Sequence, residues 1–384
     1  MSSSRLKIVV APNALKGSLD AQGAAEAIGR GVRRVMPEIE LCLAPVADGG
    51  DGMRRVLQGA LGLETLSSRV QGPLGEPIDA PFLFDPGSGL ALIELADAAG
   101  LALLPPDRRD PLKTSTFGAG QLIRAALDRG ASRILLGIGG SATHDGGTGI
   151  ASALGVRFLD DAGRELAGEG ASLERISAID FTGVDPRLSR TSLEVASDVD
   201  NPLLGEQGAA RVYAPQKGAG ARQVEQLERG LTNLAEVISR ELGVNIHHLP
   251  GAGAAGGAGG GLHGLFGAML RPGAELVLDL TGFRDKLAGA DLVITAEGRL
   301  DGQTARGKAP AAVARQAKAA GIPCIAIGGS LGEGHEKLIA AGIDALFSLC
   351  PGPITLEQAM ADAPRLLEDA TEQAFRLFLL GSRT

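Results

Sequence analysis

Apolar and polar positions near the start of the chain predict a strand, a helix, a second strand and a second helix. The apolar run at 7–11 predicts the first strand, and the helical periodicity of 18–36 predicts the first helix, with Ser18 as its N-cap. Residues 40–44 and 51–61 repeat the pattern, with Asp51 as the second N-cap. This order is typical of an open parallel sheet.

The same pattern returns near the other end of the chain. Strands are predicted at 291–295, 323–327 and 345–349, with a helix at 303–320 and a short helix before Gly342. Between the two ends, a stretch rich in Pro and Gly at 70–95 predicts antiparallel strands, and 133–138 and 193–197 predict strands that lead into loops. We therefore predict a Rossmann-like, doubly wound α/β domain from residues 1–65 and 288–384. A second α/β domain is inserted at 66–287, with ligands in the cleft between the domains.

Composition restricts the class of protein. The chain has 384 residues, of which 44% are hydrophobic, enough for two cores. A net charge of −8, with 3% aromatic residues and no Trp, argues against nucleic acid as a partner. The first apolar run is too short for a secretion signal, and no run is long enough to span a membrane, so we expect a cytoplasmic protein. Cys42, Cys324 and Cys350 lie too far apart in sequence to suggest a zinc site.

Glycine clusters follow several of the predicted strands. GIGGSA at 137–142 fits G-x-G-x-x-G/A, and Asp160 follows about 20 residues later, as in a dinucleotide-binding fingerprint. The loop continues through Gly147, however, which moves the predicted helix start to near Asp145. Backbone N–H groups with the hydroxyls of Ser141 and Thr143 suit a polyphosphate, and close packing of the chain is the alternative. A second match at 251–256 follows no clear strand.

Charged residues gather in a loop near the C-terminal end. GQTARGKA at 302–309 resembles a P-loop, but Ala309 stands where the metal-binding hydroxyl belongs. Five residues, 297–301, also separate the segment from the strand, so we reject a P-loop. Acidic and basic side chains after a buried strand indicate either a ligand site or a loop that pairs with itself.

Other polar residues also follow predicted strands. Lys16 follows the first strand, where ligands bind in open α/β sheets, so we expect it to face a ligand. Asp48 follows the second strand, and either a ligand or a helix cap explains it. Asp198, Asp200 and Asn201 offer oxygen atoms suited to Mg²⁺, with an Asn-Pro turn as the alternative. Among the histidines, His144 in its glycine loop is the one to examine.

Seven motifs, in order, span nearly the whole chain. They are APNALKGSL (11–19), PVADGGDG (45–52), GIGGSATHDGG (137–147), SDVDNPLLGEQGAA (197–210), APQKGA (214–219), GAGAAGG (251–257) and TAEGRLDGQTARGKAP (295–310). Together they closely resemble the type-1 glycerate kinase family. Asn13 and Ala14 stand where that family commonly has Asp-Ser, and His144 stands where Asn is common. These departures bear on fine substrate preference more than on the reaction.

The resemblance implies transfer of the γ-phosphoryl group of ATP to D-glycerate, usually at the 2-hydroxyl, with Mg²⁺ as a cofactor. It also implies two α/β domains, and a homodimer is one expected assembly. Phosphoryl transfer depends on positioning and on neutralising oxygen charges. The residues alone leave open whether 2- or 3-phosphoglycerate is formed and which acid is the base.

With the resemblance, the motif residues receive expected roles. Those expected to act in catalysis are Lys16, Asp198, Arg299 and Asp301, with Asp198 favoured as the base. Those expected to bind substrate are Ser18, Asp48, Gly49, Gly50, Asn201 and Gln303. Those expected to bind ATP are Gly139, Gly140, Ser141, Thr143, Gly146, Gly147, Lys217, Gly253, Gly256, Gly257 and Lys308. Those expected to hold the metal are Glu297, Asp301 and Asp198.

Two alternatives from other classes remain. GIGGSA with Asp160 supports an NAD-dependent hydroxy-acid oxidoreductase. A metabolite-binding protein that kept the fold would bind glycerate without turnover.

Overall fold

The computed structural model describes residues 6–50 and 52–381, which form two compact units. The first contains the described residues up to Asp48, Arg55–Leu61 and the described residues from Ala274 onward. The second contains Gly49–Arg54, apart from residue 51, and Gly62–Gly273. The predicted division after residue 65 falls inside a strand of the second unit, and the division at 287 lies beyond the end of that unit.

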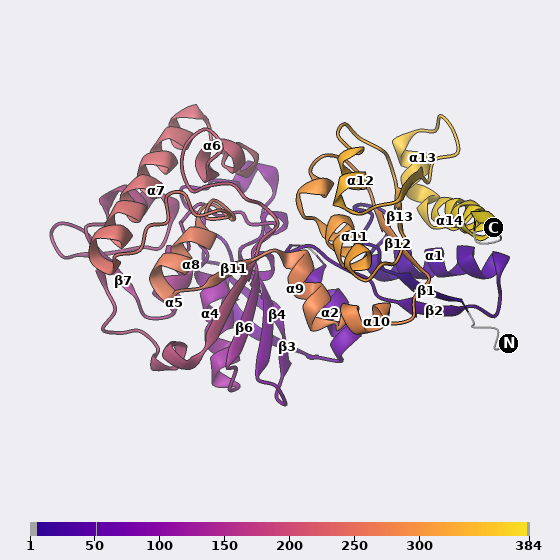
Figure 1. Ribbon diagram of the computed structural model, residues 1–384. Coiled ribbons are helices and arrows are strands. Elements are labelled where there is room, and N and C mark those ends of the chain that lie inside the picture. Colours follow the sequence, from indigo (N-terminus) through magenta and orange to yellow (C-terminus); the bar gives the residue numbers. More distant parts are fainter. Residues whose placement is uncertain (1–5, 51, 382–384) are drawn as a thin grey trace. The chain divides into compact units, whose positions relative to one another are not determined.

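The first unit is built around a parallel sheet with the strand order β14-β13-β12-β1-β2 (Figure 1). Its strands are β1 (Lys7–Val10), β2 (Glu40–Leu43), β12 (Leu292–Glu297), β13 (Cys324–Gly328) and β14 (Ala345–Ser348). Its helices are α1 (Ala21–Val35), α2 (Met53–Leu61, of which the first two residues belong to the second unit), α9 (Gly273–Leu280, of which the first residue belongs to the second unit), α10 (Phe283–Leu287), η6 (Thr304–Arg306), α11 (Ala309–Ala319), α12 (Lys337–Ala341), α13 (Leu356–Ala361) and α14 (Ala363–Gly381).

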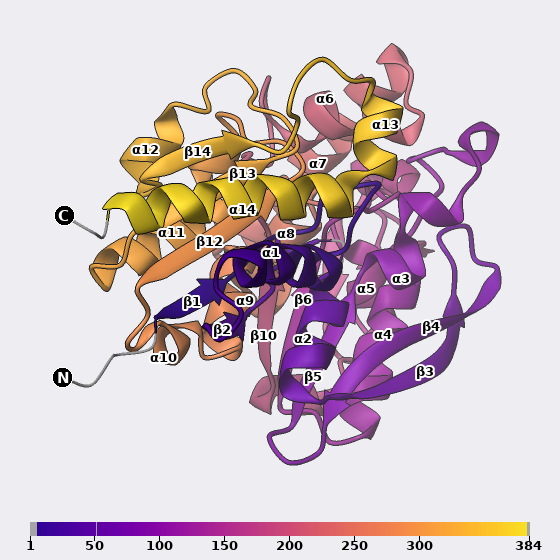
Figure 2. The same cartoon turned by 90° about the vertical axis from the view of Figure 1, so that its right-hand side faces the viewer.

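Helices cover the central strands of this sheet, which explains their almost continuous apolar sequences. Every residue of β12 and β13 is buried. Alternate residues of β1 and β12, such as Ile8 and Ile294, pack against α1 and α14, which lie side by side in Figure 2. Arg34 of α1 also forms ion pairs with Glu368 and Asp369 of α14. Helix α11 contacts β12 and β13. Helix packing therefore fixes the central strands, and with them the loops that follow the strands at the carboxyl edge of the sheet.

The second unit contains a mixed sheet with the order β11-β10-β6-β5-β4-β3 and a small antiparallel sheet with the order β8-β7-β9 (Figure 1). Its strands are β3 (Glu64–Gln71), β4 (Pro77–Asp85), β5 (Leu90–Glu94), β6 (Arg133–Gly137), β7 (Arg157–Leu159), β8 (Glu165–Leu166), β9 (Ala178–Asp180), β10 (Ser192–Ala196) and β11 (Met269–Arg271). Its helices are α3 (Ala96–Ala99), η1 (Leu101–Leu103), η2 (Pro106–Arg108), α4 (Phe117–Asp128), α5 (Thr148–Ala153), η3 (Gly170–Arg175), η4 (Pro186–Arg190), α6 (Ala209–Tyr213), η5 (Pro215–Lys217), α7 (Ala221–Leu242) and α8 (Ala258–Phe266).

The predicted fold class is confirmed: strands from both chain ends share one parallel sheet, and another α/β unit lies between them in sequence. The predicted antiparallel stretch is also confirmed, because β4 pairs in antiparallel fashion with both β3 and β5. The remaining predicted strands agree with the structure to within one or two residues.

Three predicted helix starts are wrong, each for a local reason. Helix α1 begins at Ala21, because the Asp20 carboxylate, not the Ser18 hydroxyl, accepts the N–H of Gly23 at 2.8 Å. Helix α11 begins only at Ala309, after Gly307 with φ +131°. Helix α5 begins at Thr148, after two glycines with positive φ. The predicted N-cap Asp51 lies outside the described residues.

None of the helices in the described residues is long and apolar enough to cross a membrane. The cytoplasmic location and the homodimer stay predictions.

The cap of α1 gives a first testable prediction. Replacing Asp20→Ala should lower the free energy of unfolding by about 1 kcal/mol, because the Gly23 N–H loses its acceptor. Asp20→Asn should lower the free energy of unfolding much less, since Asn caps a helix nearly as well as Asp. Denaturant unfolding of both variants and of Ser18→Ala measures this. A larger loss for Ser18→Ala than for Asp20→Ala would restore Ser18 as the cap.

Candidate functional site

The strand order of the first unit reverses between β1 and β12, which places the loops after these strands side by side. Strand β1 pairs with β12, and the Asn13 N–H donates to the Ala296 carbonyl at 2.8 Å just beyond the paired residues. In open α/β sheets, ligands bind at the carboxyl ends of the strands where the order reverses. The loop with Lys16 and the loop with Glu297 therefore form the candidate site of this unit.

Lys16 lies at the tip of a tight turn. Leu15 and Leu19 form an antiparallel bridge around it, and Gly17 adopts φ +81°. A Cβ added at Gly298, just after β12, would lie 3.4 Å from the backbone nitrogen of Lys16. The Lys16 side chain is exposed, which fits a ligand-facing role. Ser18 does not cap α1, because it precedes Asp20 and its hydroxyl donates to the Leu15 carbonyl; its predicted substrate-binding role stays a prediction.

Glu297 is a buried acid at the end of β12, with 8% of its surface exposed. Burial, followed by the nearby Asp48 carboxylate, raises the pKa of Glu297 to about 7. The Thr304 hydroxyl donates to Oε2 at 2.9 Å. No described residue donates a hydrogen bond to Oε1. This carboxyl group therefore keeps one oxygen for a ligand and titrates close to neutral pH.

Two other acids of this unit are engaged by the protein itself. Asp48 accepts from the Asn13 side chain at 3.0 Å and from the Ala309 N–H, at the start of α11, at 2.8 Å. Asp301 accepts from the backbone of the turn that follows it and pairs with Arg299 at 3.2 Å. Both acids therefore shape the loops, and Asp48 caps a helix other than the one that follows it.

The remaining predicted residues of this loop lie close to Glu297 in sequence and in space. Lys308 is the N-cap residue of α11, and its charge opposes the rise in the pKa of Glu297. Gln303 is exposed and donates its backbone N–H to Asp301. The charged groups of the loop after β12 thus pair in part with one another, whereas one oxygen of the Glu297 carboxyl group has no described partner.

In the second unit, the parallel strands β5, β6, β10 and β11 also end at one edge. Gly49 and Gly50 lie against this edge: a Cβ at Gly49 would approach Ala196, and Gly50 lies against Gly139. The Asp198 carboxylate accepts from the Gly49 N–H through one oxygen and from the Gly273 N–H, at 3.0 Å, through the other. Asp198 therefore anchors two segments of backbone at this edge.

The two glycine segments of this unit pack directly on each other. A Cβ at Gly261 would overlap the Gly146 carbonyl, and one at Gly256 would overlap the Thr143 carbonyl. Gly146 also donates its N–H to the Gly256 carbonyl at 3.1 Å. Close packing of the chain therefore explains several glycines that were predicted to bind ATP.

The other predicted ATP-binding glycines differ in their surroundings. Gly147 and Gly257 adopt positive φ values of 76° and 89° and belong to the same packed contact. A Cβ at Gly253 would overlap the Pro202 carbonyl. Gly140 is exposed with φ +71°, and so remains open to a ligand.

Lys217 and His144 are buried beneath the first glycine loop. Lys217 donates to the Ser141 hydroxyl at 2.8 Å and to the Thr143 carbonyl at 2.7 Å. Burial lowers the pKa of Lys217 to about 7. Burial, and then the Lys217 charge, hold the pKa of His144 well below its usual range. Neither ring nitrogen of His144 nor the Thr143 hydroxyl has a described partner. Lys217 therefore holds the loop in place from within.

Asn201 is also occupied by the chain. Its side-chain oxygen accepts from the Tyr213 hydroxyl at 2.6 Å, and its amide donates to the Gln207 carbonyl at 2.8 Å. Both groups of the Asn201 side chain are thus engaged by the chain, although no turn is assigned at 201–202, and its substrate-binding role stays a prediction.

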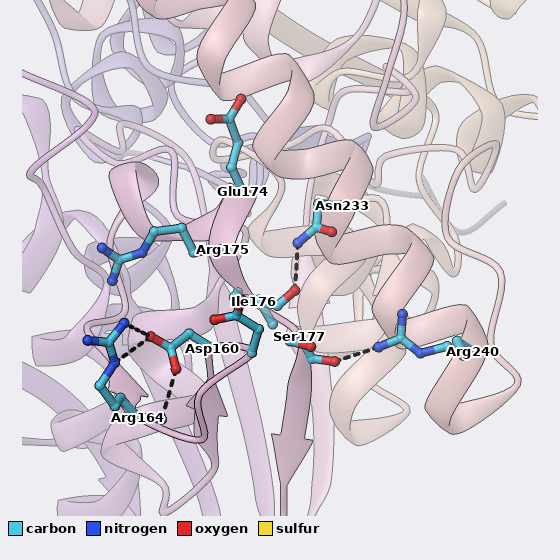
Figure 3. A pocket seen from close by; sticks show the side chains of 9 residues that line it. Asp160, Arg164, Glu174, Arg175, Ile176, Ser177, Asn233 and Arg240 are labelled. Atoms are coloured by element: carbon cyan, nitrogen blue, oxygen red, sulfur yellow. Dashed lines mark hydrogen bonds and ion pairs between the residues drawn. The ribbon is translucent and has the colours of Figure 1, made fainter.

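Asp160 does not lie in a dinucleotide-binding arrangement. Its carboxylate accepts from the backbone of Ala162 and Arg164 and pairs with the Arg164 guanidinium at 2.9 Å. Figure 3 shows this pair in a depression that also includes Asn233, bonded to the Ile176 carbonyl, and Arg240, bonded to the Ser177 carbonyl. Asp160 thus stabilises a turn, and the structure offers no support for its role in binding a ribose.

Sequence reasoning missed two residues that organise these loops. Thr304 is fully buried and holds Glu297. Asp145 is fully buried and accepts hydrogen bonds from the backbone and hydroxyl of Thr116 and from the N–H groups of Gly147 and Gly149. The contact between Asp145 and Thr116 could not be predicted from a local motif, because the two residues lie 29 positions apart in sequence.

Among the described residues, no group of three or more His, Cys, Asp or Glu side chains is placed to hold a metal ion.

The fold is of the α/β class, and the charged groups in the loops at these strand ends are of the kind that bind anionic ligands in such proteins. A profile of the glycerate kinase family matches residues 8–379. The glycerate kinase of Halalkalibacterium halodurans is 48% identical over 363 residues, which cover 94% of this chain and 96% of the relative. The glycerate 2-kinase of Escherichia coli K12 is 42% identical over 358 residues, with 93% and 94% covered.

A solved structure is also similar over nearly the whole chain. It is described as a glycerate kinase 2 from Salmonella typhimurium LT2, with a TM-score of 0.87 and 43% identity over 99% of this chain and 100% of that one. The chain therefore belongs to the glycerate kinase family and is a kinase. The oxidoreductase and non-catalytic alternatives are set aside.

The packing of the glycine segments predicts a large effect on stability. Gly261→Ala should lower the free energy of unfolding by at least about 2 kcal/mol, because the new methyl group would overlap the Gly146 carbonyl. Gly59→Ala in α2 is the matched control: its Cβ meets nothing within 4 Å, and it should stabilise by about 0.5–1 kcal/mol. Equal effects of the two substitutions in denaturant unfolding would refute this account of the packing.

The raised pKa of Glu297 predicts a pH dependence. The folded protein holds a proton on Glu297 up to about pH 7, whereas the unfolded chain releases it near the ordinary value of 4.5. The stabilisation is therefore complete below pH 4.5 and is lost as the pH rises to about 7, on the order of 3 kcal/mol. Glu297→Gln should remove this contribution, so its stability relative to the natural chain should rise between pH 5 and pH 8. A constant difference in unfolding free energy would contradict the assignment.

Proposed function

We propose that the chain transfers the γ-phosphoryl group of ATP to the 2-hydroxyl of D-glycerate, forming 2-phosphoglycerate and ADP. Membership of the glycerate kinase family supports the reaction, and the 42% identity with a glycerate 2-kinase supports the position of transfer. The observation on which the mechanism rests is the buried Glu297, which keeps one carboxyl oxygen without a described protein partner.

Glu297 is the residue that we assign as general base. The glycerate hydroxyl oxygen forms a bond to the γ-phosphorus, and the bond from that phosphorus to its bridging oxygen breaks, so that ADP leaves with the electron pair. The hydroxyl proton passes to Oε1 of Glu297. A pKa of about 7 suits a base that works near neutral pH. This assignment replaces the expectation that Asp198 is the base.

The cations near Glu297 are proposed to meet the charges of the ligands. Lys16 is exposed at its turn, and we propose that its ammonium group meets the glycerate carboxylate or the transferring phosphoryl group. Arg299 is mostly exposed beside Asp301, and Lys308 begins α11. Fixed positive charge around a transferring phosphoryl group is the main contribution of kinase sites.

Asp198 is proposed to position backbone rather than to transfer a proton. Each of its carboxylate oxygens already accepts a backbone N–H, so the group fixes Gly49 and Gly273. The glycine loop after β6, in which Gly140 is exposed and the buried Ser141 is held by Lys217, is proposed to bind ATP phosphates.

Mg²⁺ fits the oxygen chemistry of the Glu297 site. The nearby carboxylates of Asp48 and Asp301 raise the pKa of Glu297, and a cation would offset their negative charge. Mg²⁺ commonly uses one or two carboxylates together with phosphates and water. Asp301 would hold the ion, which neutralises phosphate charge when bound.

Phosphorus NMR of the product tests the reaction and its position together. With ATP, Mg²⁺ and D-glycerate, we expect a new phosphomonoester signal split into a doublet, because the phosphorus of 2-phosphoglycerate couples to one proton. A triplet, from two protons, would indicate 3-phosphoglycerate. Conversion of ATP to ADP that does not depend on glycerate, with no ester signal, would contradict the proposed reaction.

The roles of the acids are tested by kinetics at several Mg²⁺ concentrations. Glu297→Gln should lower kcat by about 10²–10⁴-fold even at saturating Mg²⁺, as expected for loss of a base. Asp301→Asn should mainly raise the Mg²⁺ concentration needed for half activity. Restoration of Glu297→Gln by excess Mg²⁺ would make Glu297 a metal ligand instead.

A further inference from the structure

The loop after β13 continues alongside the loop after β12. Gly329 donates its N–H to the Glu297 carbonyl at 3.0 Å. Farther along, Leu300 donates to the Ser330 carbonyl at 2.9 Å and accepts from the Gly332 N–H at 2.8 Å. These hydrogen bonds extend the pairing of the two strands beyond their ends. The loop at 329–336 is therefore fixed next to the proposed base, although no motif of the sequence pointed to it.

Gly332 brings this loop against charged groups of the candidate site. A Cβ at Gly332 would lie 2.6 Å from Nε of Arg299 and 3.0 Å from Cβ of Asp301. A side chain larger than hydrogen would therefore displace the Arg299–Asp301 pair. The loop at 329–336 therefore contacts two charged residues of the candidate site.

His335 is held in this loop by a hydrogen bond that fixes its tautomer. Its Nδ1 lies 2.7 Å from the Gly332 carbonyl oxygen. A carbonyl oxygen only accepts, so Nδ1 carries the proton. In the neutral ring, Nε2 then presents a lone pair, and no described residue donates to it. The side chain is 39% exposed, and its Nδ1 lies 3.8 Å from the Glu336 carboxylate.

We propose that His335 binds the acceptor substrate, with Nε2 accepting a hydrogen bond from the glycerate hydroxyl that is not phosphorylated. This inference rests on the proposed glycerate kinase reaction. A lone pair on Nε2 repels carboxylate and phosphate oxygens but accepts from a hydroxyl, and glycerate offers two hydroxyls. Arg299, next to Gly332, is suited to the anionic part of the ligands. His335 would thus select acceptors that have both hydroxyls.

Two substitutions separate the two ring nitrogens. In His335→Asn, the side-chain amide can still donate to the Gly332 carbonyl as Nδ1 does, but nothing replaces Nε2. In His335→Gln, the amide reaches the position of Nε2. We expect His335→Asn to raise the KM for D-glycerate about tenfold, with the KM for ATP within twofold of the natural value. His335→Gln should lie nearer to the natural chain.

A second acceptor provides a readout that a purely structural role would not change. D-lactate has the 2-hydroxyl but lacks the 3-hydroxyl, so the natural chain should use it with a much lower kcat/KM than D-glycerate. His335→Asn should reduce the ratio of kcat/KM for D-glycerate to kcat/KM for D-lactate about tenfold, because the contact that distinguishes the two acceptors is lost.

The outcomes distinguish this inference from the proposed function. If the natural chain does not phosphorylate glycerate, the proposed function fails, and this inference fails with it. If the natural chain is active but His335→Asn keeps its KM for glycerate and its selectivity, this inference alone is overturned. A rise in the KM for ATP instead would assign the contact to the ribose hydroxyls. A lower Tm in both variants with unchanged KM values would show that His335 is only structural.

Discussion

The burial of a carboxyl group at the end of β12 is the constraint on which the first unit depends. An acid with 8% of its surface exposed must be neutralised by a proton or by nearby positive charge. The neighbouring acids increase this demand, yet Asp48 and Asp301 are committed to hydrogen bonds and an ion pair with the chain. Glu297 differs from them in having one carboxyl oxygen to which no described residue donates a hydrogen bond. Its position follows from the strand order, which reverses between β1 and β12.

The second unit illustrates a different constraint, the need for backbone segments to approach each other closely. The segments around Gly146 and Gly256 touch through their main chains, which only glycine permits at these positions. Beneath them, the buried Lys217 ammonium group donates hydrogen bonds to Ser141 and Thr143 of the glycine loop. Asp145 accepts four hydrogen bonds from the surrounding chain. The geometry of any phosphate site here is therefore set by buried polar contacts rather than by a free helix terminus.

Much of this arrangement could be predicted from sequence, because apolar runs define buried parallel strands and the residues after them define a sheet edge. Lys16 and Glu297 were identified in this way. Partners distant in sequence could not be predicted: Asp48 caps a helix that begins at Ala309, and Asp198 binds Gly49 and Gly273. The glycine motif was ambiguous for a physical reason, since ligand approach and backbone packing both require the absence of a Cβ.

The central claim is that Glu297 is the acid that meets the reacting hydroxyl. A crystal structure with D-glycerate, Mn²⁺ and a non-hydrolysable ATP analogue tests it most directly. The account predicts the glycerate 2-hydroxyl within hydrogen-bonding distance of Glu297 Oε1, with Lys16 near an anionic group of a ligand. Glycerate bound with its hydroxyl on Asp198, and Glu297 still bonded only to Thr304, would contradict the account.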